Sequence, residues 1–430
     1  MLLVYTDFES ERLRFILDLI LEQLLGVQYQ IVHDLSPEQE QEPLIDYRSD
    51  PQYGLKIRSY SLLKETKIRS VKVSGREVSG QYEILLDDEQ DFDPFAAAFF
   101  LTSRYEEYLP HEADAHDRFS SNSSCLKDMN VLDRPLVNEW ALEIRDDLQL
   151  RFSDLQFNPR KFEYLSTIDI DQAWKYKHKG FLRTMGGFLG DLVSFRTSKL
   201  FERLTVLLGL IRDPFDNYDI QKVWHAEYGT KVQYFLQVGE RGKFDKNQDS
   251  GNEAFQKLIR ELDRVAHVNI HPSYQSNYQK SHITTELRAL EAILGRKVNR
   301  SRQHFLMHKM PETYLNLIEL GIRQDYTMGY STDLGFRGGI AAPFHFYDLS
   351  VDEYTDLLLI PFCFMDITPL HYMSKSVPQA EEVASEMIDK VKKVGGLFCT
   401  LWHNESLSDS ERWKGWRPLY HHILEECANS

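Results

Sequence analysis

The chain has 430 residues and carries 50 Lys or Arg against 66 Asp or Glu, so its formal net charge is −16. This acidic balance argues against nucleic acids and anionic membranes as partners, because their phosphates need a basic surface. No apolar run reaches about 18 residues, the N-terminus lacks a basic segment followed by an apolar one, and the four cysteines are scattered. We therefore expect a cytoplasmic protein without a signal peptide or a membrane span.

Residues 1–157 predict a small α/β domain. An apolar stripe at helical spacing favours a helix over 10–25, and Asp93-Pro94 marks the start of a second helix over 93–108. The segment 104–140 is polar and irregular, so we expect it to be a loop and connector that packs on the second domain. Short extended patterns predict strands at 1–5, 27–32, 57–60 and 82–86.

Residues 158–430 alternate short apolar strands with helices. This alternation predicts parallel strands joined by crossover helices, and seven strands suggest a distorted (β/α)7-like barrel. The expected helices are 181–212 (broken at Gly186-Gly187), 254–262, 284–294, 311–320, 379–394 and 412–427. The expected strands are 164–170, 232–238, 265–270, 303–306, 326–330, 357–362 and 397–402. Active sites of such barrels lie at the carboxyl ends of the strands.

Asp169 and Asp171 end the first of these strands. Side chains two residues apart on a strand share a face, so the two Cα atoms are expected roughly 6.6 Å apart. Two carboxylates at a strand end can bind a metal ion and activate a water molecule. Asp residues also commonly cap helices or open loops, and the segment by itself leaves that alternative open.

Later strands also end in residues with useful chemistry. His271 follows the third strand, and His304 lies in the next one. Asp366 and His403 follow the late strands. Asp and His ligands suit zinc, iron or cobalt. His267 is excluded as a partner of His271, because four residues of strand span about 13 Å.

The order of these motifs resembles the polysaccharide deacetylases (the NodB homology domain, carbohydrate esterase family 4). The resemblance covers roughly residues 160–430. It rests on Thr167-Ile168-Asp169-Ile170-Asp171, His271-Pro272-Ser273-Tyr274, Arg302 and Leu401-Trp402-His403. A divergent bacterial subgroup with an α/β domain in front is closer still, through Ile270–Tyr274, Arg302-Gln303-His304, 326–330 and 335–339.

The resemblance implies metal-dependent hydrolysis of an N-acetyl group on a sugar or polysaccharide, with zinc as the expected metal. By the family pattern Asp169 is the general base and His403 the general acid. Asp171 and His271 are metal ligands. The substrate-binding candidates are Arg302, which orients the base, Leu401, which walls the acetyl methyl, and in addition Trp402, Arg337 and Asp366.

One position departs from the family pattern. The second histidine of the family's two-histidine motif falls at Gln275, and a neutral amide is a poor zinc ligand. His304 is the candidate replacement, although it can equally be a packed strand residue. The departure keeps open a carbohydrate-binding protein that has lost catalysis. Because the same strand-end chemistry serves several substrates, a deacylase of a small non-sugar amide or imide is a further alternative.

Overall fold

The computed structural model describes residues 1–429. Near the N-terminus lies a four-stranded parallel sheet in the order β2-β1-β3-β4. Its strands are β1 (Leu2–Tyr5), β2 (Tyr29–Val32), β3 (Leu44–Arg48) and β4 (Leu55–Arg58), and an antiparallel hairpin follows in β5 (Val73–Val78) and β6 (Gln81–Leu86). The sequence predicted every strand of this part except β3 and β5.

The two predicted N-terminal helices begin within one residue of the expected position, but the second ends early. Helix α1 (Glu11–Leu17) continues as the π-helical η1 (Asp18–Leu24). Asp93 caps α2 (Pro94–Thr102) by accepting from the N–H groups of Phe95 and Ala96. This helix ends before residue 108 because Arg104 is left-handed at φ 55°. Beyond it come η3 (Tyr105–Tyr108), α3 (Cys125–Asp128) and α4 (Leu136–Arg151), so the expected connector ends in a helix.

A nine-stranded sheet forms the rest of the molecule, in the order β12-β13-β11-β10-β9-β8-β7-β15-β14. Only β12 and β13 pair antiparallel, and all other pairings in this sheet are parallel. The predominance of parallel strands agrees with the predicted α/β class. The strands are β7 (Glu163–Ile170), β8 (Lys231–Leu236), β9 (His267–Ile270), β10 (Arg300–Ser301), β11 (Gln324–Asp325), β12 (Phe344–Asp348), β13 (Glu353–Leu359), β14 (Phe364–Met365) and β15 (Leu397–His403).

Strands β13 and β14 are two parts of one stretch of chain. β13 pairs with β11, and β14 pairs with β15, which lies beyond β7 in the sheet. Between them the N–H of Phe362 donates to Met328 O at 3.0 Å and that of Cys363 to Cys399 O at 3.1 Å. Apolar side chains on the inner side of the sheet, among them Leu165, Phe235 and Leu401, form a separate small core. A closed seven-stranded barrel stays a prediction.

Helices flank this sheet, and several carry clear start and stop signals. Asn252 caps α8 through Phe255 N–H, Gly295 ends α9 at φ 70°, and Ser376 with Gln379 forms a capping box for α11. The helices are α5 (Phe181–Val193), α6 (Thr197–Leu207), α7 (Tyr218–Glu227), α8 (Glu253–Asp263), α9 (Lys280–Leu294), α10 (Glu312–Glu319), α11 (Val377–Lys393) and α12 (Trp416–Ala428). Short 3-10 or π turns are η2 (Gln39–Gln41), η4 (Ser121–Ser123), η5 (Tyr274–Asn277), η6 (His304–Leu306), η7 (Thr368–Tyr372), η8 (Ser406–Ser408) and η9 (Glu411–Trp413).

Three predicted elements are wrong in place or type. The strand expected at 303–306 is the turn η6, because Phe305 and Leu306 adopt φ 59° and 53°, which no strand tolerates. Residues 326–330 form a loop after the two-residue β11. The long helix over 181–212 breaks at 194–196, where Phe195 is left-handed, and α5 runs through both glycines.

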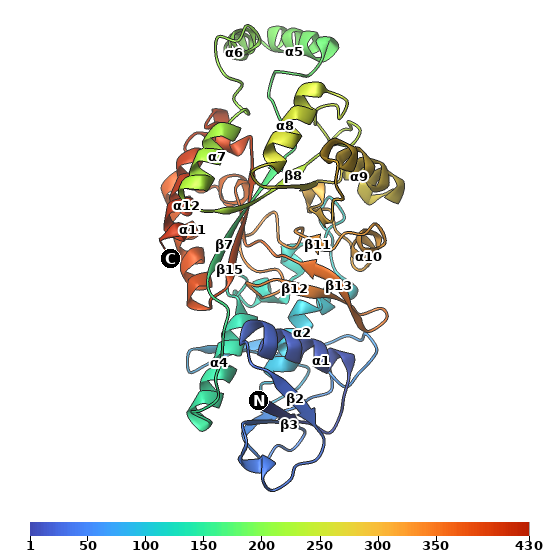
Figure 1. The fold of residues 1–430 in the computed structure, drawn as a ribbon, viewed down its shortest axis with the longest axis vertical. Coiled ribbons are helices and arrows are strands. Elements are labelled where there is room, and N and C mark those ends of the chain that lie inside the picture. Colours follow the sequence, from blue (N-terminus) through green and yellow to red (C-terminus); the bar gives the residue numbers. More distant parts are fainter. Residues whose placement is uncertain (430) are drawn as a thin grey trace.

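The N-terminal elements lie at one end of the long axis, next to β12 and β13, while α5 and α6 lie at the opposite end (Figure 1). Buried ion pairs join the N-terminal part to the large sheet. Arg12 meets Asp352 at 2.6 Å, and Glu107 meets Arg337 at 2.7 Å. Within residues 1–429, none of the helices combines the length and apolar character that crossing a bilayer requires.

Candidate metal centre and its cavity

Strand register brings the predicted acid and base side by side. Asp169 lies near the end of β7 and is paired in register with His403, the last residue of β15. On the other side of β7, Asp169 is paired with Phe235 of β8. Because neighbouring strands lie about 4.8 Å apart, these partners face the same space at the carboxyl edge of the sheet.

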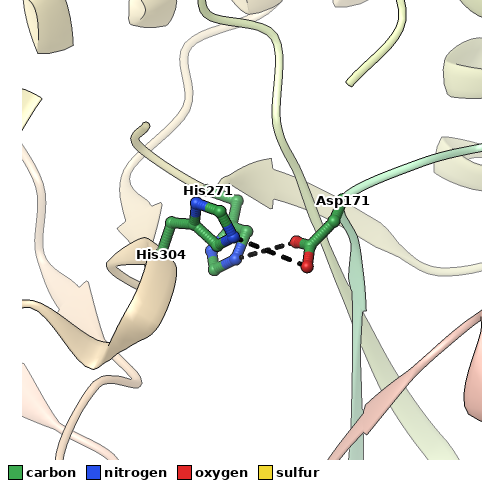
Figure 2. A group of neighbouring side chains, drawn as sticks. All are labelled: Asp171, His271 and His304. Atoms are coloured by element: carbon green, nitrogen blue, oxygen red, sulfur yellow. Dashed lines mark ion pairs between the residues drawn. The ribbon is translucent and has the colours of Figure 1, made fainter. Parts of the chain in front are cut away.

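Asp171, His271 and His304 form a compact group at this edge. One ligand atom from each lies within 4.8 Å of the others. The Asp171 carboxylate faces both rings, with Oδ1 3.3 Å from His271 Nε2 and Oδ2 3.5 Å from His304 Nε2 (Figure 2). Asp171 follows β7, His271 follows β9, and His304 lies in the turn η6 after β10.

Both imidazoles are oriented by their other nitrogen. The Nδ1–H of His271 donates to the carbonyl of Arg302 at 2.6 Å. His304 Nδ1 lies 2.8 Å from Asp245 Oδ1, a carboxylate that accepts its proton. In each ring this leaves Nε2 as the free nitrogen that faces Asp171. Metal-binding histidines commonly donate the N–H of their other ring nitrogen to a carboxylate or a backbone carbonyl, as both of these rings do.

The cluster fits a divalent cation. Asp171 Oδ1 is buried and has no hydrogen-bond partner, although an unpaired buried carboxylate oxygen is unfavourable. Burial would raise the pKa of Asp171, but the two histidines hold it well below its usual range. Burial opposes charge on His304, yet Asp171 and Asp245 raise its pKa to about 9. One carboxylate and two imidazoles are a donor set that zinc accepts, with room for a non-protein ligand.

Asp169 lies beside this cluster but is held by a different partner. Its Oδ1 accepts from Arg302 Nη1 at 3.0 Å, and its Oδ2 lies 3.6 Å from His271 Nε2. Arg302 is fully buried and also donates to Thr167 Oγ1 at 2.7 Å. The guanidinium therefore fixes one oxygen of Asp169 and leaves the other directed toward the cluster.

His403 is held by Asp366. Its Nδ1 lies 3.0 Å from Asp366 Oδ1, and its backbone N–H donates to Asp366 Oδ2 at 2.7 Å. Burial alone would lower the pKa of His403, but the Asp366 carboxylate outweighs it and raises that pKa to about 10. The ring is therefore protonated at neutral pH, with Nε2 as the nitrogen not engaged by Asp366.

These side chains line a cavity of about 250 Å³. Asp169, Asp171, His271, His304 and His403 supply its polar side. Apolar side chains face them, among them Leu401, Met365, Ile367, Phe305 and Trp413. A reacting group in this space meets the cluster, a carboxylate and a protonated imidazole together.

Several of the predicted residues do not line this cavity. Trp402 is buried on the opposite side of β15 from Leu401 and His403, where its ring packs 4.8 Å from that of Tyr420. Arg337 is buried in a bidentate pair with Glu107. Arg302 and Asp366 act behind the lining by holding Asp169 and His403. Gln275 is exposed in η5 and contributes nothing to the cluster.

Two residues that the sequence reasoning missed support the cluster. Asp245, in the loop after β8, orients His304. Arg118, from the N-terminal part, lines the cavity and donates to the carbonyl of Phe305 and, at 3.0 Å, to Ser331 Oγ. It thereby holds the left-handed turn that carries His304. The position of Asp245 beyond a strand end was a usable signal, whereas nothing in the sequence links Arg118 to the site.

Comparisons with known proteins find a family model that matches part of the chain and solved structures that are remotely similar. Residues 2–153 match a family described as a family of unknown function (DUF7033). No curated protein matches the sequence. Among solved structures, a "putative polysaccharide deacetylase" from Mycobacterium smegmatis is 14% identical with a TM-score of 0.42, over 63% of this chain and 84% of that one.

Two further structures are similar at the same level. An allantoinase, Puue, is 11% identical with a TM-score of 0.40, over 62% of this chain and 85% of its own. A polysaccharide deacetylase from Bacillus cereus is 11% identical with a TM-score of 0.30, over 62% of this chain and 88% of its own. Because the TM-scores are low, the functional conclusion rests on the geometry of the cavity.

Proposed function

We propose that this chain is a metal-dependent hydrolase that removes the acetyl group from an N-acetylated sugar or polysaccharide. The observation that carries the proposal is the convergence of three elements on one cavity. They are the Asp171–His271–His304 cluster, the carboxylate of Asp169 and the protonated ring of His403. Hydrolysis of an amide requires this division into activated water, base and acid.

Asp171, His271 and His304 are the residues that would hold the cation, and zinc suits them best. When bound, it polarises the amide carbonyl and makes water more acidic. The protein prepares the ligands in advance, because Asp245 and the Arg302 carbonyl fix both imidazoles with Nε2 toward Asp171. The exposed Gln275 is not needed for this set.

Asp169 is the proposed general base. Arg302 occupies its Oδ1, so Oδ2 is the oxygen available to take the proton from the attacking water. Asp171 and Asp169 thus take different roles because their partners differ, two histidines for one and an arginine for the other.

His403 is the proposed general acid. An amine is a poor leaving group as an anion, so its nitrogen must gain a proton as the C–N bond breaks. Asp366 keeps His403 protonated and holds Nδ1, and the proton at Nε2 is the one delivered. Leu401, Met365 and Ile367 would face the acetyl methyl. The cavity admits a small acyl group, so most of a saccharide would lie outside it.

We further propose that the chain divides into residues 1–157 and a distorted (β/α)7 barrel over 158–430, with 353–365 as the segment that completes the barrel. The division is supported by the separate sheets. The first domain is more than a neighbour of the site, since Arg118 contacts the loop that carries His304. A role in building the cavity is therefore proposed for the N-terminal domain.

Acetate release from N-acetylated oligosaccharides, with and without a chelator, tests the proposal. We expect release by the purified protein, loss on chelation and recovery on adding zinc. Release that survives both chelation and Asp169→Asn would contradict it. Saccharide binding without turnover would indicate a binding protein instead, and turnover of small non-sugar amides alone would indicate the other deacylase function.

A further inference from the structure

The helices α5 and α6 form a hairpin that stands apart from the sheets. They lie at the far end of the long axis, opposite the N-terminal elements, and are joined to the body by extended chain (Figure 1). α5 packs mainly on α6. We refer to residues 181–211 as the hairpin. Its position allows a flat surface to contact it without meeting the N-terminal part of the molecule.

The hairpin is apolar on its outside. On α5, Leu182, Met185, Leu189 and Val193 follow one another at helical spacing, and their exposed fractions are 84, 43, 58 and 76%. Phe195, between the helices, is 89% exposed. Of the 23 large hydrophobic residues that are exposed in the described chain, thirteen belong to the hairpin. A contiguous apolar surface of this kind marks an interaction site.

An ion pair lies inside the hairpin, beside a few apolar side chains such as the buried Val206 and the half-buried Phe188. Asp191 is buried between the helices and pairs with Arg203 of α6 at 2.7 Å. The guanidinium of Arg203 lies so close to Gly187 that a side chain there would collide with it. A helix pair that is surrounded by solvent usually places its apolar side chains between the helices and its charged side chains outside. This hairpin instead exposes most of its large apolar side chains and encloses an ion pair, which favours an apolar medium against its outer face.

The charge of this region identifies the medium. The hairpin itself contains four Lys or Arg and two Asp or Glu, and the flanking Lys175, Lys177, Lys179 and Arg212 bring residues 175–212 to a net charge of +6 in a chain of net charge −16. Four of these cations, Lys175, Lys199, Arg203 and Arg212, are engaged in salt bridges, whereas Lys177, Lys179, Arg183 and Arg196 form none within the described residues. Arg196 is exposed between the helices, next to Phe195. Exposed apolar and aromatic side chains combined with basic residues are the features of a helix that lies in the interface of an anionic bilayer.

We propose that the hairpin docks the protein onto an anionic phospholipid surface, with the outer faces of α5 and α6 in the interfacial layer. Neither helix crosses the bilayer. A second copy of the chain is disfavoured as the occupant, because pairing two hairpins would bring two such basic segments together. The sequence analysis expected no membrane partner because the chain as a whole is acidic. That total charge does not reflect the net positive charge of the region around the hairpin.

Vesicle flotation with the full chain tests the docking. Neutral phosphatidylcholine vesicles are compared with vesicles that also contain phosphatidylglycerol. We expect the protein to float with the anionic vesicles, less so at high salt, because screening weakens the charge term. The triple variant Leu182→Ser, Leu189→Ser, Phe195→Ser should lower binding by roughly tenfold or more.

Leu150→Ser is the matched control, because Leu150 is 87% exposed on α4, outside the hairpin. It should bind as the unmodified chain does. All three replaced positions are exposed, and circular dichroism checks that the variants fold. No flotation of the unmodified chain, equal binding to both vesicles, or unchanged binding of the triple variant would overturn the proposal. So would a dimer in sedimentation velocity that the triple variant abolishes, without vesicle binding.

Discussion

The cavity and the hairpin are built in opposite ways. The cavity gathers carboxylates, imidazoles and a guanidinium in the interior, and it leaves one buried carboxylate oxygen of Asp171 without a hydrogen bond. The hairpin encloses an ion pair and exposes most of its leucines and phenylalanines. The two regions are linked, since Lys199 of α6 pairs at 3.1 Å with Glu411, a neighbour of the cavity residue Trp413.

Both regions place side chains in an unfavourable environment. Charged side chains are buried in the cavity, and apolar side chains are exposed to water on the hairpin. Burying a carboxylate oxygen without a hydrogen bond and exposing a continuous apolar stripe are each unfavourable in isolation. Each arrangement becomes favourable once a missing partner is supplied, a cation in the first region and a lipid surface in the second. Variants in the cavity should therefore alter chemistry without altering docking, and variants in the hairpin should do the reverse.

Asp169→Asn should have the largest effect among the cavity variants that spare the metal. Removing a general base typically lowers the rate by roughly 10²–10⁴-fold. The metal content should stay unchanged, because Asp169 is held by Arg302 and is not part of the three-residue cluster. Acetate release and metal analysis on the same sample check this. Loss of metal together with activity would show that Asp169 is a ligand.

Asp366→Asn should move the alkaline limb of the pH profile. His403 acts as an acid only while protonated, and its pKa of about 10 keeps it protonated across neutral pH. The rate should therefore fall only as pH rises through about 10. Without the carboxylate, the pKa of His403 falls and the limb should shift to lower pH by roughly one to three units. A profile that keeps its alkaline limb would contradict the assignment of His403.

Arg118→Ala should have the smallest effect, because Arg118 acts through the loop that carries His304. We expect metal affinity to fall by roughly tenfold, as for other residues that position ligands. Arg118→Lys should recover little, since the compact ammonium of lysine does not reproduce the forked contacts that two guanidinium nitrogens make with Phe305 O and Ser331 Oγ. Competition with a chelator measures the affinity. A lowered melting temperature with unchanged affinity would leave Arg118 a purely structural role.

Strand periodicity predicted the part of the site that lies on strands. Asp169 and His403 meet in register, and Asp171 follows on the same edge. The same rule, applied to β15, excludes Trp402, because its neighbours Leu401 and His403 face the cavity. His304 reaches the cluster from a left-handed turn instead of the expected strand. Turns of that kind and long-range contacts such as that of Arg118 depend on tertiary packing, which a single sequence does not encode locally.

Metal analysis of two variants tests the central claim most directly. His304→Ala removes an imidazole of the cluster. Gln275→Ala removes the amide at the position where the resemblance to polysaccharide deacetylases would place a metal ligand. We expect the purified chain and Gln275→Ala to bind one divalent ion with the same affinity, and His304→Ala to lose it. Full metal content in His304→Ala, or loss of the metal in Gln275→Ala, would contradict the assignment of His304, and not Gln275, as a ligand of the proposed site.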